Sequence, residues 1–161
     1  MENNLIIFIH LVAAAVGMGS LVFCLVLFLP AMEKLPNQEK VPEEYSIPYK
    51  TMEVLAPTVL VCVLTLIGSG LYYLWANYTR QVDLTPGYYD LFGIKMLFVV
   101  ASLFLSVYHT FTLRSRIANL DLTPENRKLV PATLKKMVTL SQVLLGTLSA
   151  AAFMGIWMAR F

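Results

Sequence analysis

Charge is the scarcest feature of this 161-residue chain, since only 14% of its residues are Asp, Glu, Lys or Arg while 58% are apolar. A soluble domain normally carries charge on about a quarter of its residues. Cysteine is also scarce, with two residues, which excludes a secreted disulfide scaffold. The composition likewise excludes a disordered segment and a nucleic-acid binder. The class of protein that remains compatible with this composition is a membrane protein.

Four long apolar stretches are present instead. Each is close to the roughly 20 residues that a helix needs to cross about 30 Å of hydrocarbon. Their length and continuous apolarity distinguish them from buried strands. We therefore predict an all-α fold, a single four-helix transmembrane domain over residues 1–161, with helices at 5–29, 54–76, 91–113 and 137–158.

The ends of these predicted helices follow from proline and from the N-terminus. The first helix is expected to end at Pro30, and Pro57 is expected in the first turn of the second helix, where a missing N–H costs little. The chain begins Met1-Glu2 without the basic residues of a signal peptide. We expect the first helix to be retained.

Basic residues are distributed unequally between the two sides of this bundle. Nine Lys or Arg residues follow helices one and three or precede helices two and four, whereas the other side has only Arg80, Arg160 and Lys95. By the positive-inside rule, the nine lie in the cytoplasm and both termini lie outside. The nine are Lys34, Lys40, Lys50, Arg114, Arg116, Arg127, Lys128, Lys135 and Lys136.

Three ionisable residues lie within the spans: His10, Lys95 and His109. Such residues are costly in hydrocarbon, which makes each a functional candidate. At a rise of 1.5 Å per residue, His10 lies ~8 Å and Lys95 ~6 Å below the outer starts of their helices, and His109 lies ~27 Å below. His10 and Lys95 can therefore share an outer site, whereas the two histidines cannot clamp one haem.

His10 has small neighbours on its own helix face. Ala13, Ala14 and Gly17 follow it by three, four and seven residues, which gives clearance for a flat macrocycle. A neutral imidazole in apolar surroundings is a common axial ligand of haem b. The alternative is that these small residues only allow two helices to touch.

The other two ionisable residues have two interpretations each. Lys95 either neutralises a propionate or an anionic substrate, or extends to the nearby interface. His109 either extends into the inner headgroups beside Tyr108 or ligates iron of a second, inner haem. Met137 or another chain would supply the sixth ligand of that haem, if it has one.

Copper is the rival to haem. Met154 and Met158 lie one turn apart near the outer end of helix four, close to the level of His10, and thioethers with an imidazole suit Cu(I). Cys24 and Cys62 lie at different depths and are expected to be small apolar residues rather than a metal pair.

Several segments carry a family resemblance over essentially the whole chain. HLVAAAVGMGSLVF at 10–23 and LFLPAME at 27–33 resemble the first helix of HemJ-type protoporphyrinogen oxidases and the related CopD-like membrane domains. APTVLVCVLTLIGSGLYYL at 56–74 is similar to their second helix. TPGYYDLFGIKMLFVV at 85–100, with His109 beyond it, resembles their third.

This resemblance implies that His10 binds haem b or forms an active site and that Lys95 is functional. The chain departs from the family pattern at Gly17 and Met18, where an aromatic residue is usual, and at Ala31, where a basic residue is usual. The interval between Lys95 and His109 is also longer, by about one helical turn.

Together these observations predict a haem b-binding protein of the bacterial inner membrane that takes part in redox or electron-transfer chemistry. One haem is expected through His10, and a second through His109 is the alternative to extension of that side chain into the headgroups. The alternatives are oxidation of protoporphyrinogen IX to protoporphyrin IX, copper handling, and an accessory subunit of a respiratory complex. Expected partners are the lipid bilayer, other membrane redox subunits and a second copy of the chain.

Overall fold

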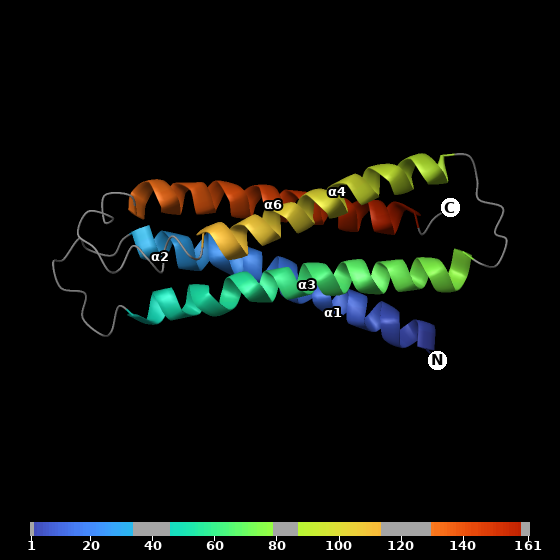
Figure 1. Cartoon of the computed structure of the whole chain (residues 1–161), viewed down its shortest axis with the longest axis horizontal. Helices are drawn as coiled ribbons and strands as arrows, with labels where there is room; N and C mark the ends of the chain where they lie inside the picture. Colours follow the sequence, from blue (N-terminus) through green and yellow to red (C-terminus); the bar gives the residue numbers. More distant parts are fainter. Residues whose placement is uncertain (1, 34–45, 79–86, 114–129, 159–161) are drawn as a thin grey trace.

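The computed structural model describes residues 2–33, 46–78, 87–113 and 130–158. Apart from Gly87, which lies in a turn, these residues are helical and form a four-helix bundle (Figure 1). The predicted all-α, four-helix fold is confirmed. The elements are α1 Glu2–Phe23, the π-helical turn η1 Cys24–Phe28, α2 Leu29–Glu33, α3 Ser46–Tyr78, α4 Tyr88–Tyr108, the π-helical turn η3 His109–Leu113, and α6 Val130–Met158.

The helices form two antiparallel pairs. α1 packs against α3 and α4 packs against α6, while contacts of α3 with α4 and of α1 with α6 close the bundle. α1 and α4 are therefore diagonal to each other. The start of α1, the end of α3, the start of α4 and the end of α6 lie at one end of the bundle, to the right in Figure 1. We refer to this part as the terminal half and to the opposite part as the distal half.

Four segments of this bundle are long and apolar enough to cross a membrane: Asn4–Ala31, Val54–Ala76, Asp90–Phe111 and Ala132–Met158. Their surfaces carry large apolar side chains, such as Leu97 and Phe104, which are 68% and 70% exposed. In water such a surface would be strongly unfavourable, whereas lipid tails solvate it. The chain is thus a multi-pass membrane protein in contact with the bilayer.

The predicted helix boundaries were wrong at two prolines. The first helical segment passes through Pro30 and ends at Glu33. The Leu29 N–H donates to the Cys24 carbonyl, so a widened π turn comes directly before Pro30. Local π turns of this kind accommodate proline in membrane helices. Pro57 lies well inside α3 rather than in its first turn, because that helix already begins at Ser46.

The start of the fourth helix was also misplaced. α6 begins at Val130, seven residues before the predicted Met137, and includes Lys135 and Lys136. The physical reason is that charged residues end the apolar run without ending the helix, since lysine is a good helix former.

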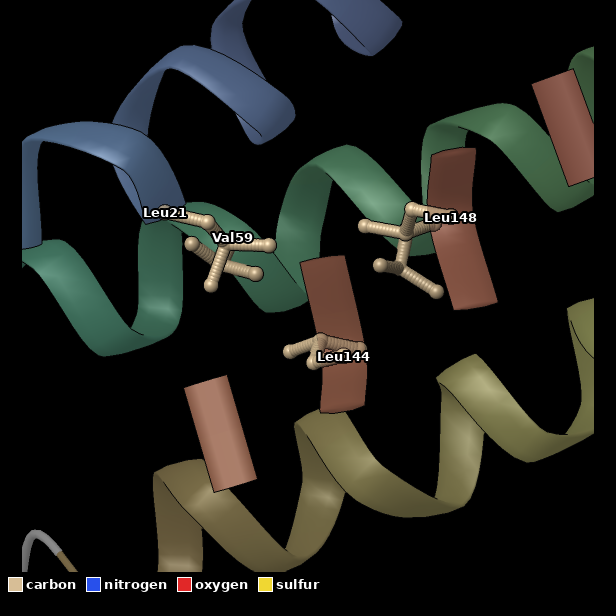
Figure 2. Close-up of a cluster of buried hydrophobic side chains, with 5 residues drawn as sticks. Leu21, Val59, Leu144 and Leu148 are labelled. Carbon is tan, nitrogen blue, oxygen red and sulfur yellow. The ribbon is translucent and has the colours of Figure 1, made fainter. Parts of the chain in front are cut away.

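Two clusters of buried side chains hold the bundle together. One combines Leu21, Val59, Val63, Leu144 and Leu148 from α1, α3 and α6 at mid-length, and Figure 2 labels Leu21, Val59, Leu144 and Leu148. The other lies in the distal half. The second cluster is formed by Cys24, Phe28, Leu29 and Met137.

The terminal half is packed differently. Among the described side chains, none in α3 after Val63 and none in α4 before Ser102 is buried. Among the described residues, α3 and α4 therefore have buried side chains only in their middle and distal parts.

A polar seam joins α4 to α6. Three α4 residues at intervals of seven meet small or hydroxyl-bearing α6 residues, and seven residues is close to two helical turns. Small residues and hydroxyl hydrogen bonds are the usual contacts between membrane helices. We call the following three pairs the α4–α6 seam: Lys95 with Gly155, Ser102 with Thr147, and His109 with Ser141.

Candidate functional site

His10 lies on α1 in the terminal half and is half-buried against α3. Its Nδ1 lies 2.7 Å from the Oγ of Ser69, and the Ser69 hydroxyl lies 2.6 Å from the Thr65 carbonyl. The ring also lies close to Gly70, where an added Cβ would be 3.7 Å from the His10 Cε1. The antiparallel pairing of α1 with α3 thus positions one nitrogen of the imidazole on a hydroxyl.

The other ring nitrogen of His10 is available. Within the described part of the chain, Nε2 has no hydrogen-bond partner. Since the same residues contain no buried side-chain nitrogen or oxygen without a partner, Nε2 is open to the surface. A half-buried imidazole with one nitrogen held and one open can ligate a metal or accept a proton.

Lys95 lies on α4 in the same half and is half-buried. Its Nζ would be 3.4 Å from a Cβ added at Gly155, so the ammonium lies against the backbone of α6. No carboxylate among the described residues pairs with it. Among the described residues, the terminal half therefore contains both a cation without a carboxylate partner and an imidazole with one open nitrogen.

The position of the ammonium bears on whether Lys95 extends toward the interface. Gly155 lies at the position on α6 that the spacing of the α4–α6 seam predicts for a partner of Lys95. Successive contacts of this seam are seven residues apart on α4 and six or eight residues apart on α6. The Lys95 ammonium therefore lies at about the same height along the bundle axis as the backbone of Lys95. A lysine that extended toward the end of the bundle would meet α6 about one turn beyond Gly155.

The small residues after His10 have a packing role. A Cβ at Gly17 would lie 3.1 Å from the Cβ of Cys62 on α3, and Ala13 is only 7% exposed. Ala14 is half-buried. Close approach of α1 to α3 accounts for the size of Gly17, and the structure gives no added support to its predicted role in clearing space for a cofactor.

His109 lies in the distal half and is enclosed. Its side chain is 3% exposed, and its Nε2 is 3.4 Å from the Oγ of Ser141 on α6. The interpretation that His109 extends into the headgroups is therefore wrong, because the histidine packs inward on α6. The neighbouring Tyr108 ring is contacted by Lys136, whose Nζ lies 5.3 Å from the ring centre.

The two histidines belong to separate regions of the bundle. Ser141, beside His109, and Gly155, beside Lys95, are about 21 Å apart along α6. Met137, the predicted partner of an inner haem, is 1% exposed and lies one turn before Ser141. Ligation of haem by His109 would require α6 to move aside, and that role stays a prediction.

The methionines and cysteines singled out in the sequence lie in different environments. On α6, Met154 is half-buried and Met158 is 8% exposed, and the copper role proposed for them stays a prediction. Cys24 and Cys62 are buried free thiols. Within the described ranges, no group of three or more His, Cys, Asp or Glu residues could hold a metal ion.

Sequence analysis did not identify Ser69, Ser102 or Ser141 as partners of these residues. A serine within an apolar segment has a small free-energy cost in the membrane and hardly changes the mean hydropathy of the segment. One signal was available, since Ser102 lies midway between Lys95 and His109 at intervals of seven residues. That interval predicts one helix face.

The fold and the site define a four-helix integral membrane protein with a histidine and lysine site in the terminal half of its bundle. Comparison with protein-family models, with curated proteins and with solved structures gives no match. The function must therefore be argued from the site itself.

Proposed function

We propose that the chain is a haem b-binding membrane protein of redox or electron-transfer chemistry, with His10 as the axial ligand. The observation that supports this most is the His10 ring, whose Nδ1 is held by Ser69 and whose Nε2 is open. Metal-ligating histidines almost always have their second ring nitrogen hydrogen-bonded in this way. A histidine that served only to pack two helices would not require an open nitrogen.

The surroundings of His10 fit a tetrapyrrole. The described terminal segments of α3 and α4 contain no buried side chain, so a flat apolar group entering there displaces no core residue. Gly70 lies beside the imidazole on α3, since a Cβ added there would be 3.7 Å from the His10 Cε1, an ordinary van der Waals contact. A hydrophobic macrocycle gains stability from the apolar surfaces of the surrounding helices.

Lys95 favours an anionic ligand. Its ammonium is half-buried without a carboxylate partner in the described residues, and an unpaired charge in hydrocarbon is unfavourable. A haem propionate would neutralise it. The same argument applies to protoporphyrinogen, which is also a carboxylated tetrapyrrole, so its oxidation is the second candidate function.

Each residue has a distinct part in this proposal. Bound haem supplies an iron that takes up and releases one electron. His10 would bind the iron and set the depth of the group in the membrane, Ser69 would orient the imidazole, and Lys95 would hold a carboxylate. The surrounding apolar side chains exclude water from the ring.

The orientation follows from the distribution of basic residues. We place the distal half at the cytoplasmic face of a bacterial inner membrane and both termini outside, because nine of the twelve Lys and Arg residues are on the distal side. The haem would then lie in the outer leaflet, where it could exchange electrons with another membrane redox subunit.

One visible spectrum of the purified protein, oxidised and reduced, tests the proposal. We expect a Soret band with reduced bands of a b-type haem in protein from cells supplied with haem. His10→Gln should lose most of this absorbance while still inserting, and the matched variant His109→Gln should keep it. Colourless wild-type protein would refute the proposal.

A further inference from the structure

The hydroxyl of Ser69 has one proton and two neighbours that compete for it. One is the Thr65 carbonyl, 2.6 Å away, with the Leu66 carbonyl at 3.3 Å on the same helix. The other is the His10 Nδ1, 2.7 Å away. A carbonyl can only accept a hydrogen bond, whereas a neutral imidazole nitrogen can donate or accept.

The distance to Thr65 decides which neighbour receives the proton. Two oxygens 2.6 Å apart repel each other unless a hydrogen lies between them, and neither Thr65 nor Leu66 can supply one from its carbonyl. The Ser69 proton is therefore used on its own helix. Its oxygen can then only accept from His10, which requires a proton on Nδ1.

We infer that Ser69 is a positioning residue that holds His10 in the tautomer with the proton on Nδ1 and the lone pair on Nε2. The nitrogen that is open to the surface is then the one able to bind a metal or accept a proton. The tautomer follows from the geometry alone, while its consequence for haem rests on the proposed function. The arrangement also fixes the plane of the ring, because α3 carries the acceptor.

The tautomer can be measured directly because the chain contains only two histidines. In protein labelled with nitrogen-15 at histidine, the variant His109→Gln leaves His10 as the single source of signal. At a pH where the ring is neutral, we expect a protonated, pyrrole-type Nδ1 and an unprotonated, pyridine-type Nε2 in the haem-free protein. A protonated Nε2 would overturn the inference.

Three substitutions test whether Ser69 is responsible. Ser69→Ala should convert the single tautomer into a mixture, and Ser69→Thr should restore it, since Thr58 and Thr65 make the same bond to a carbonyl on this helix. Ser106→Ala is the matched control, because that hydroxyl donates to the Leu103 carbonyl and does not contact His10. If Ser69→Ala keeps the single tautomer, Ser69 has no positioning role. If Ser69→Ala fails to fold, Ser69→Cys gives the same comparison with a weaker acceptor.

Haem titration of the same variants separates this inference from the proposed function. Loss of a partner that orients a ligating histidine typically weakens metal affinity by about 10- to 100-fold. We expect that loss for Ser69→Ala, its recovery in Ser69→Thr, and no change in Ser106→Ala. If the wild type binds no haem, the proposed function fails while the nitrogen spectrum still decides the tautomer. Equal haem affinity in wild type and Ser69→Ala would refute the positioning role.

Discussion

A methyl group added at Gly17 is expected to weaken the contact between α1 and α3. The new Cβ would lie 3.1 Å from the Cβ of Cys62, which is tighter than an ordinary van der Waals contact. Both atoms are attached directly to the backbone, so neither can rotate away. Relief requires the two helices to separate by a few tenths of an ångström along a seam that also contains the buried Ala13.

The magnitude comes from two opposing effects. Replacing glycine by alanine inside a helix stabilises it by about 1 kcal/mol, whereas overpacking a close contact costs about 1–3 kcal/mol. Gly19→Ala has the first effect without the second, because a Cβ at Gly19 would have nothing within 4 Å. We therefore expect Gly17→Ala to be about 1–3 kcal/mol less stable than Gly19→Ala.

The assay is the free energy of unfolding in mixed micelles, measured for both variants. Both variants replace glycine by alanine within α1, so the difference between their unfolding free energies excludes the contribution of helix propensity and the effect of the micelle on that contribution. In a Cys62→Gly background the contact disappears, so Gly17→Ala should then behave like Gly19→Ala. Equal stability of the two alanine variants in the wild-type background would refute the packing role of Gly17.

Three further predictions concern the seam, the charge and the orientation. Ser102→Ala removes the hydrogen bond to Thr147 and should lower the free energy of unfolding by about 0.6–1.7 kcal/mol. A double-mutant cycle with Thr147 checks that this loss comes from the Ser102–Thr147 interaction. Lys95→Met should lower the midpoint potential of bound haem in a redox titration, because a nearby positive charge favours the reduced iron, whereas Lys95→Arg should preserve it; an unchanged potential would exclude Lys95 from the site. Lys135→Cys, at an exposed position, should react with a maleimide only from the cytoplasmic side, and reaction in intact cells from outside would reverse the proposed orientation.

Hydropathy predicted the number of helices and their approximate spans because the cost of placing polar residues in hydrocarbon dominates all other effects. The same signal misplaced helix ends. Pro30 and Lys135 both lie within helices, since a π turn accommodates the proline and lysine merely marks where the helix leaves the apolar region. Hydropathy therefore predicts which residues lie in the membrane, but not where each helix ends, because the helices continue beyond the apolar region.

The site was predicted in part for a related reason. His10 and Lys95 were identified because ionisable groups in a span require an explanation, and helix rise placed them at similar depth. Ser69 was not identified, since its importance depends on which helix packs beside His10. That pairing is a tertiary property, and no periodicity within α3 reveals it.

The two halves of the bundle have complementary roles. In the distal half, His109 and Ser141 meet within a buried region, and Ser102 bonds to Thr147 further along the same seam. These directional contacts fix the register of α4 on α6, which apolar packing in lipid would specify weakly. With the register held there, Lys95 keeps its place against α6 even though its own half of α4 contains no buried side chain among the described residues. The terminal half can thus hold the Lys95 ammonium at a defined depth in the membrane, because contacts in the distal half fix the position of α4 along α6.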